Sequence, residues 1–187
     1  MTIKRVSRTR PYFPGPGLIM LLSLFALAGC PSTDSLYRAA YEHYIWNEQD
    51  AALEILGEIL EKDGTYVPAY VLESLIRTAR GEDEMALAAL ESAKQAAAPS
   101  AVVSFNLGNI LFKKGEYGRA CSEYSQAIAL KPDFSEAFLN RANSLMMLRE
   151  YPAALNDYET FLRLSVKDNP DVKKLVSLLR VEFGGAD

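Results

Sequence analysis

Apolar residues recur along this chain at the spacing of helices that pack in pairs. Between residues 101 and 132 they follow two helical stripes, which Gly115 separates and Pro132 ends. The first stripe contains Leu107, Gly108 and Leu111, and the second contains Ala120, Tyr124 and Ala127. This range is predicted to form two antiparallel helices, in which the small residues Gly108 and Ala120 let the backbones approach closely.

The same pattern recurs at a fixed interval, in units that begin near Thr33, Val67, Ala101 and Ser135. One small-residue column is Ala40, Ser74, Gly108 and Ala142, and another is Ala52, Ala86, Ala120 and Ala154. The first helix of each unit should end at Asn47, Gly81, Gly115 and Arg149, of which only Arg149 is poorly suited to a left-handed helix end. A single bundle with accidental spacing is the competing interpretation. Four columns in phase favour four units, because a short hairpin must cover its apolar face with neighbours.

Counted from Ala101, the unit carries Leu at positions 7 and 11, Gly at 8 and 15, Tyr at 17 and 24, Ala at 20 and 27, and Pro at 32. This resembles the tetratricopeptide repeat (TPR), although Ser104 replaces the usual aromatic at position 4. The resemblance implies an all-α, right-handed solenoid of four helix hairpins within residues 35–183. The repeats are expected near 33–66, 67–100, 101–134 and 135–168, followed by a capping helix at 169–183 and a frayed tail at 184–187.

Residues 1–29 differ in composition from the rest of the chain. Four basic residues, Lys4, Arg5, Arg8 and Arg10, precede an apolar run at 18–28 that is too short for a permanent bilayer span. This segment is therefore predicted to be a secretory signal peptide. The run ends in Leu27-Ala28-Gly29-Cys30, which resembles the lipobox of bacterial lipoproteins.

The lipobox resemblance implies cleavage before Cys30, acylation of Cys30 by chains such as palmitate, and a short tether at residues 30–34. An ordinary signal peptide with a chance cysteine, or an uncleaved anchor, are the alternatives. Pro31 stands where Asp marks retention at the inner membrane in that family, so we expect an outer-membrane lipoprotein whose domain faces the periplasm.

In TPR proteins, repeat positions 5, 9 and 12 line the concave surface. In the first repeat these are Tyr37, Tyr41 and Tyr44, and in the third they are Phe105, Asn109 and Phe112. Asn143 occupies position 9 of the fourth repeat, and Asn106 and Asn140 add amides at position 6. These nine residues are the predicted partner-binding site. The alternative is that tight winding or a terminal helix covers part of this apolar row.

An amide can both donate to and accept from a peptide backbone, so a row of asparagines could hold an extended segment. The clamp that other TPR proteins use for a terminal carboxylate needs a basic residue at position 2. Here position 2 is Asp34, Pro68, Val102 and Glu136, so that clamp is not expected.

Charge and chemistry narrow the classes of function. The formal charge of −4 becomes −8 if the four basic residues of the signal are removed, which disfavours nucleic acid as a partner. His43 is the only histidine, and no metal motif, nucleotide fingerprint or nucleophile with its base appears. Neither an enzyme nor a cofactor-binding protein is therefore expected, and Cys121 is interpreted as a packing thiol.

Two classes of function remain. The favoured one is a membrane-anchored adaptor that holds a segment of another envelope protein in its concave surface. Lipoproteins of this kind act in pilus or secretin assembly, or recruit cell-wall enzymes. The alternative is a carrier of a small hydrophobic ligand, or a transporter-associated protein, that uses the aromatic lining. The sequence does not specify the partner or the oligomeric state.

Overall fold

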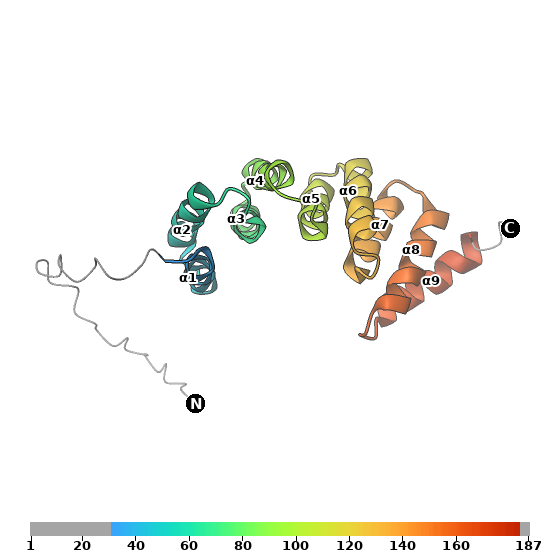
Figure 1. Cartoon of the computed structure of the whole chain (residues 1–187). Coiled ribbons are helices and arrows are strands. Elements are labelled where there is room, and N and C mark those ends of the chain that lie inside the picture. Colours follow the sequence, from blue (N-terminus) through green and yellow to red (C-terminus); the bar gives the residue numbers. More distant parts are fainter. Residues whose placement is uncertain (1–30, 184–187) are drawn as a thin grey trace, which may run out of the picture. The chain divides into compact units, whose positions relative to one another are not determined.

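The structure, a computed structural model, describes residues 31–183, and in this range it contains nine α-helices and no strand (Figure 1). They are α1 (Thr33–Ile45), α2 (Gln49–Lys62), α3 (Val67–Ala79), α4 (Asp83–Ala96), α5 (Ala101–Lys113), α6 (Tyr117–Leu130), α7 (Ser135–Met147), α8 (Tyr151–Leu164) and α9 (Pro170–Phe183). Successive pairs pack as hairpins and α9 packs on α8. The predicted all-α fold of four hairpins and a final helix is therefore confirmed.

Helices α1, α3, α5 and α7 begin at a constant interval in the sequence, at Thr33, Val67, Ala101 and Ser135. Thr33 and Asp34, predicted to belong to the tether, lie instead in the first turn of α1, and Ser32 caps that helix. The predicted signal peptide, the acylation of Cys30 and the frayed tail lie outside the described residues. Among residues 31–183, no helix has the length and hydropathy needed to span a bilayer.

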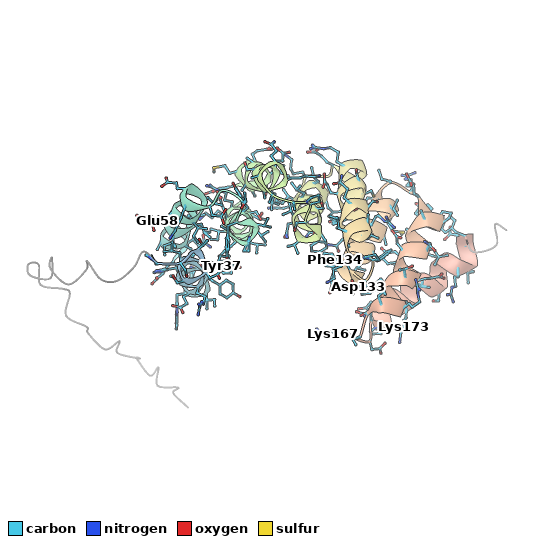
Figure 2. The ribbon with its side chains drawn as sticks, viewed as in Figure 1. Tyr37, Glu58, Asp133, Phe134, Lys167 and Lys173 are labelled. Carbon is cyan, nitrogen blue, oxygen red and sulfur yellow. The ribbon has the colours of Figure 1, made fainter. Side chains whose placement is uncertain are left out.

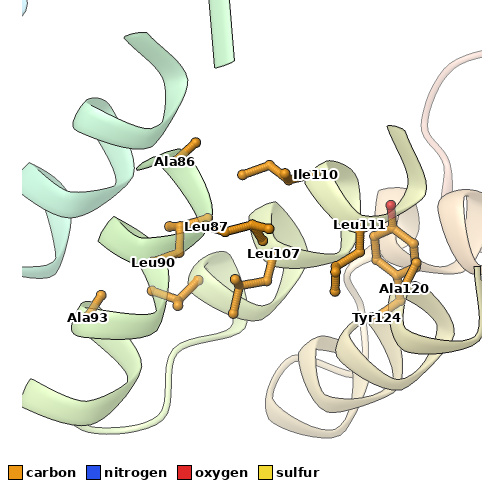
Figure 3. Packing of buried hydrophobic residues seen from close by; sticks show 10 residues of the cluster. Ala86, Leu87, Leu90, Ala93, Leu107, Ile110, Leu111, Ala120 and Tyr124 are labelled. Atoms are coloured by element: carbon orange, nitrogen blue, oxygen red, sulfur yellow. The ribbon is translucent and has the colours of Figure 1, made fainter. Parts of the chain in front are cut away.

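Small side chains let the two helices of each hairpin close on one another. Ala52, Ala86, Ala120 and Ala154 are completely buried, as are Ala40 and Ala142 in the other column. Gly108 of α5 leaves no room for a side chain, because an added Cβ would lie 2.5 Å from Cε1 of Tyr124. Figure 3 shows Tyr124 and Ala120 on α6 beside Leu111 of α5. The Tyr124 ring thus occupies space that any side chain at position 108 would need.

All four hairpin turns use one hydrogen-bonding scheme. The residue at repeat position 15 has a positive φ at Asn47 (59°), Gly81 (77°), Gly115 (80°) and Arg149 (63°). In the last turn, the Arg149 N–H donates to Met146 O and the Glu150 N–H donates to Leu145 O. This is the Schellman arrangement, which satisfies carbonyls at a helix C-terminus. Arg149 adopts the left-handed conformation despite its side chain, because the turn geometry requires it.

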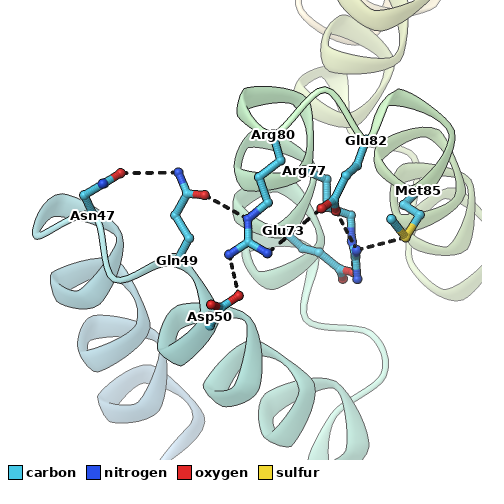
Figure 4. A network of polar contacts seen from close by, with 8 residues as sticks. All are labelled: Asn47, Gln49, Asp50, Glu73, Arg77, Arg80, Glu82 and Met85. Carbon is cyan, nitrogen blue, oxygen red and sulfur yellow. Dashed lines mark hydrogen bonds and ion pairs between the residues drawn. The ribbon is translucent and has the colours of Figure 1, made fainter.

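Charged pairs join the first three repeats across their junctions. Arg80, at the end of α3, reaches back to Gln49 (2.8 Å) and Asp50 (2.7 Å) at the start of α2 (Figure 4). The next junction repeats this contact, because Lys113 pairs with Asp83 and Lys114 pairs with Glu84. Such exposed pairs typically contribute about 0.2–1 kcal/mol each, so they favour one packing register more than they stabilise the fold.

A largely buried ion pair in the fourth repeat also connects it to the third. Arg141 of α7 donates from Nε and Nη2 to the two carboxylate oxygens of Asp157 on α8, at 2.7 and 2.8 Å. Its Nη1 donates to Ser125 of α6 at 2.9 Å. Asp157 is only 2 % exposed. The hydrogen bonds to Asp157 raise the pKa of Arg141, and the whole network links three consecutive helices.

Aromatic residues in two of the three turns between repeats pack against the first helix of the preceding unit. Tyr66 packs edge-on against Tyr37 (centroids 5.7 Å apart), and its hydroxyl donates to Asp34 at 2.9 Å. Phe134 packs against Phe105, with centroids 4.7 Å apart. Figure 2 shows Tyr37 on α1 and Phe134 before α7. The corresponding residue between the second and third repeats is Ser100, so this turn has no aromatic side chain at that position.

Replacing Gly108 with alanine should destabilise the protein by about 1–3 kcal/mol, because the new methyl group overlaps the buried Tyr124 ring. The free energy of unfolding in urea measures this effect. Gly118→Ala is the matched control, since Gly118 lies in α6 with nothing within 4 Å of the added Cβ. That control should stabilise the helix by up to about 1 kcal/mol. Equal effects of the two substitutions would contradict the close packing at Gly108.

Stability should fall above pH 10. Burial and the hydrogen bond to Asp34 raise the pKa of Tyr66 from 10.0 to about 12. Below pH 10 the phenol is protonated in the folded and unfolded chains, whereas between pH 10 and 12 only the unfolded chain ionises. The free energy of unfolding should therefore decline with pH in that window, and less steeply in Tyr66→Phe. Urea denaturation from pH 8 to 12 tests this, and identical slopes would count against it.

Candidate functional site

The predicted partner-binding residues lie on neighbouring helices. Helices α1, α3, α5 and α7 contact one another in sequence. Their repeat positions 5, 9 and 12 therefore lie side by side, and we call this set the row surface. It is lined by Tyr37, Tyr41, Tyr44, Val71, Leu75, Thr78, Phe105, Asn109, Phe112, Leu139, Asn143 and Met146.

The tyrosines of α1 form a row of ring contacts, stacked between Tyr37 and Tyr41 and tilted between Tyr41 and Tyr44. The rings of Tyr37 and Tyr41 are 6.5 Å apart, and those of Tyr41 and Tyr44 are 6.0 Å apart. Tyr37 and Tyr44 pack against the core below them, whereas Tyr41 is 46 % exposed. Leu75, at the same repeat position in α3, is 42 % exposed. The accessible part of this end is therefore apolar and centred on position 9.

Phe105 is mainly a packing residue. Its ring contacts Phe134 and also lies 5.9 Å from the ring of Tyr124. Phe112 packs edge-on against Tyr117 at 5.3 Å, but it also borders a hollow on the row surface. Both phenylalanines were predicted to contact a partner. Phe112 borders the hollow, whereas Phe105 is not among its lining residues.

Three of the four predicted amides come together. Asn140 Nδ2 of α7 donates to Asn109 Oδ1 of α5 at 2.8 Å. Together with Asn143, Phe112 and Tyr124, they line a hollow of about 90 Å³. We call it the amide hollow. None of its five lining residues carries a charge at neutral pH, so it offers hydrogen bonds without a fixed ion.

Asn106 does not join this cluster. Its Nδ2 donates to Val102 O at 2.8 Å, a carbonyl of its own helix. It also does not line the amide hollow. Asn106 and Asn140 hold the same repeat position in neighbouring repeats, yet only Asn140 takes part in the site.

Two tyrosines complete the site and were not predicted as site residues. The Tyr124 hydroxyl donates to Asn109 Oδ1 at 2.9 Å, and the Tyr158 hydroxyl donates to Asn143 Oδ1 at 2.7 Å. Burial raises the pKa of both phenols, so they remain protonated donors. The sequence did contain a signal, because tyrosine occurs at position 24 only in the two repeats that have asparagine at position 9.

The remaining candidate groups offer less chemistry. His43 Nδ1 contacts Glu48 Oε2 at 2.6 Å in the first turn between helices. Cys121 is partly buried, and burial raises the pKa of its thiol. Within residues 31–183 no cluster of histidine, cysteine and acidic side chains is arranged to hold a metal ion.

Comparisons with known proteins agree with this architecture. A family model described as "TPR repeat" matches residues 108–148. The chain is 27 % identical over 150 residues to a DnaJ homolog subfamily C member 7 homolog of Schizosaccharomyces pombe, covering 72 % of this chain and 32 % of that protein. It is 40 % identical over 62 residues to stress-induced-phosphoprotein 1 of Caenorhabditis elegans, covering 33 % and 19 %. The chain therefore spans a third or less of these relatives.

Solved structures match over most of the chain. The MamA protein aligns with a TM-score of 0.69 at 18 % identity, covering 81 % of this chain and 82 % of MamA. YrrB, described as "a TPR protein with an unusual peptide-binding site", aligns with a TM-score of 0.67 at 18 % identity, covering 83 % and 80 %. PilF of Pseudomonas aeruginosa aligns with a TM-score of 0.70 at 20 % identity, covering 80 % and 68 %. Four hairpins in phase, the family model matched at residues 108–148 and these structures together give the chain the fold of tetratricopeptide-repeat proteins.

Proposed function

We propose that this protein is a membrane-anchored adaptor of the bacterial cell envelope, which holds a segment of a partner protein on its row surface. The observation that carries the proposal is the amide hollow, where Asn109, Asn140 and Asn143 meet beside Phe112. An amide next to an aromatic ring suits a peptide, since it can hydrogen-bond the backbone while the ring contacts a side chain. The similarity to YrrB, described as having a peptide-binding site, supports the same class of ligand.

The row surface changes character along its length. Its first half exposes Tyr41 and Leu75, and its second half presents Asn109 and Asn143 at the same repeat position. A suitable partner segment has apolar side chains at one end and an accessible backbone at the other. Exposed apolar surface of this kind is typical of interaction sites.

Envelope anchoring rests on the sequence of residues 1–30. A basic stretch, an apolar run and the Leu-Ala-Gly-Cys motif favour acylation at Cys30, and Pro31 favours export to the outer membrane with the repeats facing the periplasm. Since α1 begins at Thr33, the repeats would lie close to the lipid surface. Assembly of a pilus or secretin, or recruitment of a cell-wall enzyme, would use such a position.

The size of the amide hollow does not favour the carrier alternative. Its volume of about 90 Å³ is well below the roughly 300–1,000 Å³ of pockets that enclose a drug-sized ligand. The row surface thus suits side chains and backbone of a partner better than an enclosed molecule.

Asn140→Ala should weaken partner capture, whereas Asn106→Ala should not. A photoreactive phenylalanine analogue at Leu75 in cells would report capture, with Met85 of α4 as a control site of similar exposure (48 %). Loss of one net hydrogen bond, about 0.5–1.5 kcal/mol, predicts a roughly twofold to twelvefold loss of adduct for Asn140→Ala. Equal adducts from Leu75 and Met85, or equal effects of the two alanine variants, would overturn the site.

Cys30→Ser should move the protein from the membrane fraction to the soluble fraction, because several acyl chains on one residue supply the affinity that holds an anchored protein. Cell fractionation with immunoblotting measures the distribution. Cys121→Ser is the matched control and should leave it unchanged. A Cys30→Ser variant that still sediments with membranes would contradict lipidation.

A further inference from the structure

The two amides at repeat position 9 are held in the same way. Asn109 Oδ1 accepts two hydrogen bonds, from the Tyr124 hydroxyl and from Asn140 Nδ2. Asn143 Oδ1 accepts one from the Tyr158 hydroxyl. In both repeats the tyrosine lies 15 residues after the asparagine. The oxygen of each amide is therefore directed toward the second helix of its own hairpin.

The tyrosines resist any reversal of these amides. Tyr124 and Tyr158 are only 1 % and 3 % exposed, so each hydroxyl needs an acceptor inside the protein. An amide turned by 180° would present its NH₂ group to a phenol and leave the donating hydroxyl without that acceptor. For Asn109 it would also place two NH₂ groups against each other at the contact with Asn140.

The NH₂ groups must then point away from the core. Within residues 31–183, neither Asn109 Nδ2 nor Asn143 Nδ2 has a hydrogen-bond partner, and no buried side-chain nitrogen or oxygen there lacks one. Both NH₂ groups are therefore open to solvent at the amide hollow. The hollow thus presents hydrogen-bond donors from two neighbouring repeats.

The ligand for these donors should be uncharged. The lining of the amide hollow contains amides, a phenylalanine and a protonated tyrosine, and no lysine or arginine. A carboxylate would lose hydration there without gaining an opposite charge, which is costly. A cation would find no carboxylate among the lining residues. A neutral carbonyl oxygen meets neither problem.

We propose that Tyr124 and Tyr158 are positioning residues that hold the Asn109 and Asn143 amides with their NH₂ groups outward, so that the amide hollow selects neutral carbonyl oxygens of a peptide backbone. This inference rests on the proposed function and specifies it. The site takes an internal segment of the partner, and it discriminates against a free chain terminus.

The orientation can be tested without a ligand. In the full chain, ¹⁵N–¹H spectra resolve the side-chain NH₂ groups of asparagine. Tyr124→Phe should shift the Asn109 NH₂ signals and Tyr158→Phe should shift those of Asn143, with backbone signals elsewhere retained. Tyr70→Phe is the matched control, since the Tyr70 hydroxyl donates to Gly64 O away from the hollow. Unchanged NH₂ signals in both variants would overturn the positioning role.

The selectivity can be tested with two short peptides, N-acetyl-tetraalanine with an amidated C-terminus and the same peptide with a free carboxylate. The amidated peptide should shift the Asn109 and Asn143 NH₂ signals at lower concentration than the carboxylate. Asn143→Asp is the decisive variant, because it retains the acceptor for Tyr158 and replaces the outward NH₂ with an oxygen. It should lower affinity for the amidated peptide by about tenfold.

The possible failures are distinguishable. If both peptides bind wild type and Asn143→Asp equally well, peptide capture stands and the selection of neutral carbonyls is wrong. If neither peptide binds wild type, the recognition claim and the proposed function at this hollow fail together. The ligand-free spectra then still decide whether the tyrosines orient the amides.

Discussion

Close approach of two helices within each hairpin is the constraint on which the rest of this structure depends. Ala52, Ala86, Ala120 and Ala154 have no exposed surface, and the space opposite Gly108 is taken by the ring of Tyr124. Larger residues at these points would separate the helices and shift each later repeat. The repeated spacing keeps α1, α3, α5 and α7 adjacent, and that adjacency brings side chains from different repeats to one surface.

The fold was predictable from sequence because small residues and helix ends recur at a fixed interval, and each marks a position where backbone geometry leaves little choice. The meeting of Asn109 with Asn140 followed from the same spacing. The packing contacts and rotamers of individual side chains could not be predicted from this spacing. Phe105 is covered by Phe134, a residue of the turn between repeats, and Asn106 bonds to its own helix through a local rotamer choice. Spacing alone determines neither contact.

Neighbouring repeats are held together by different forces along the array. Arg80, Lys113 and Lys114 make exposed pairs with the preceding repeat, whereas Arg141 bonds the preceding repeat while paired with the buried Asp157. Breaking a buried pair by removing one partner typically costs about 3–5 kcal/mol, far more than an exposed one. That buried pair lies within the fourth repeat, and the hydrogen bond from Arg141 to Ser125 of α6 ties it to the third repeat.

Tyr124 fills the space beside Gly108 and its hydroxyl also donates to the amide of Asn109, so residues 108, 109 and 124 cannot change independently. A mutation that enlarges residue 108 removes room for the ring, and one that shrinks the ring frees the amide. Mutations that alter ligand preference and mutations that alter core packing would therefore show strong epistasis at residues 108, 109 and 124. The first two repeats have leucine at the position of Tyr124 and a side chain at the position of Gly108, so they are free of that coupling and can drift independently.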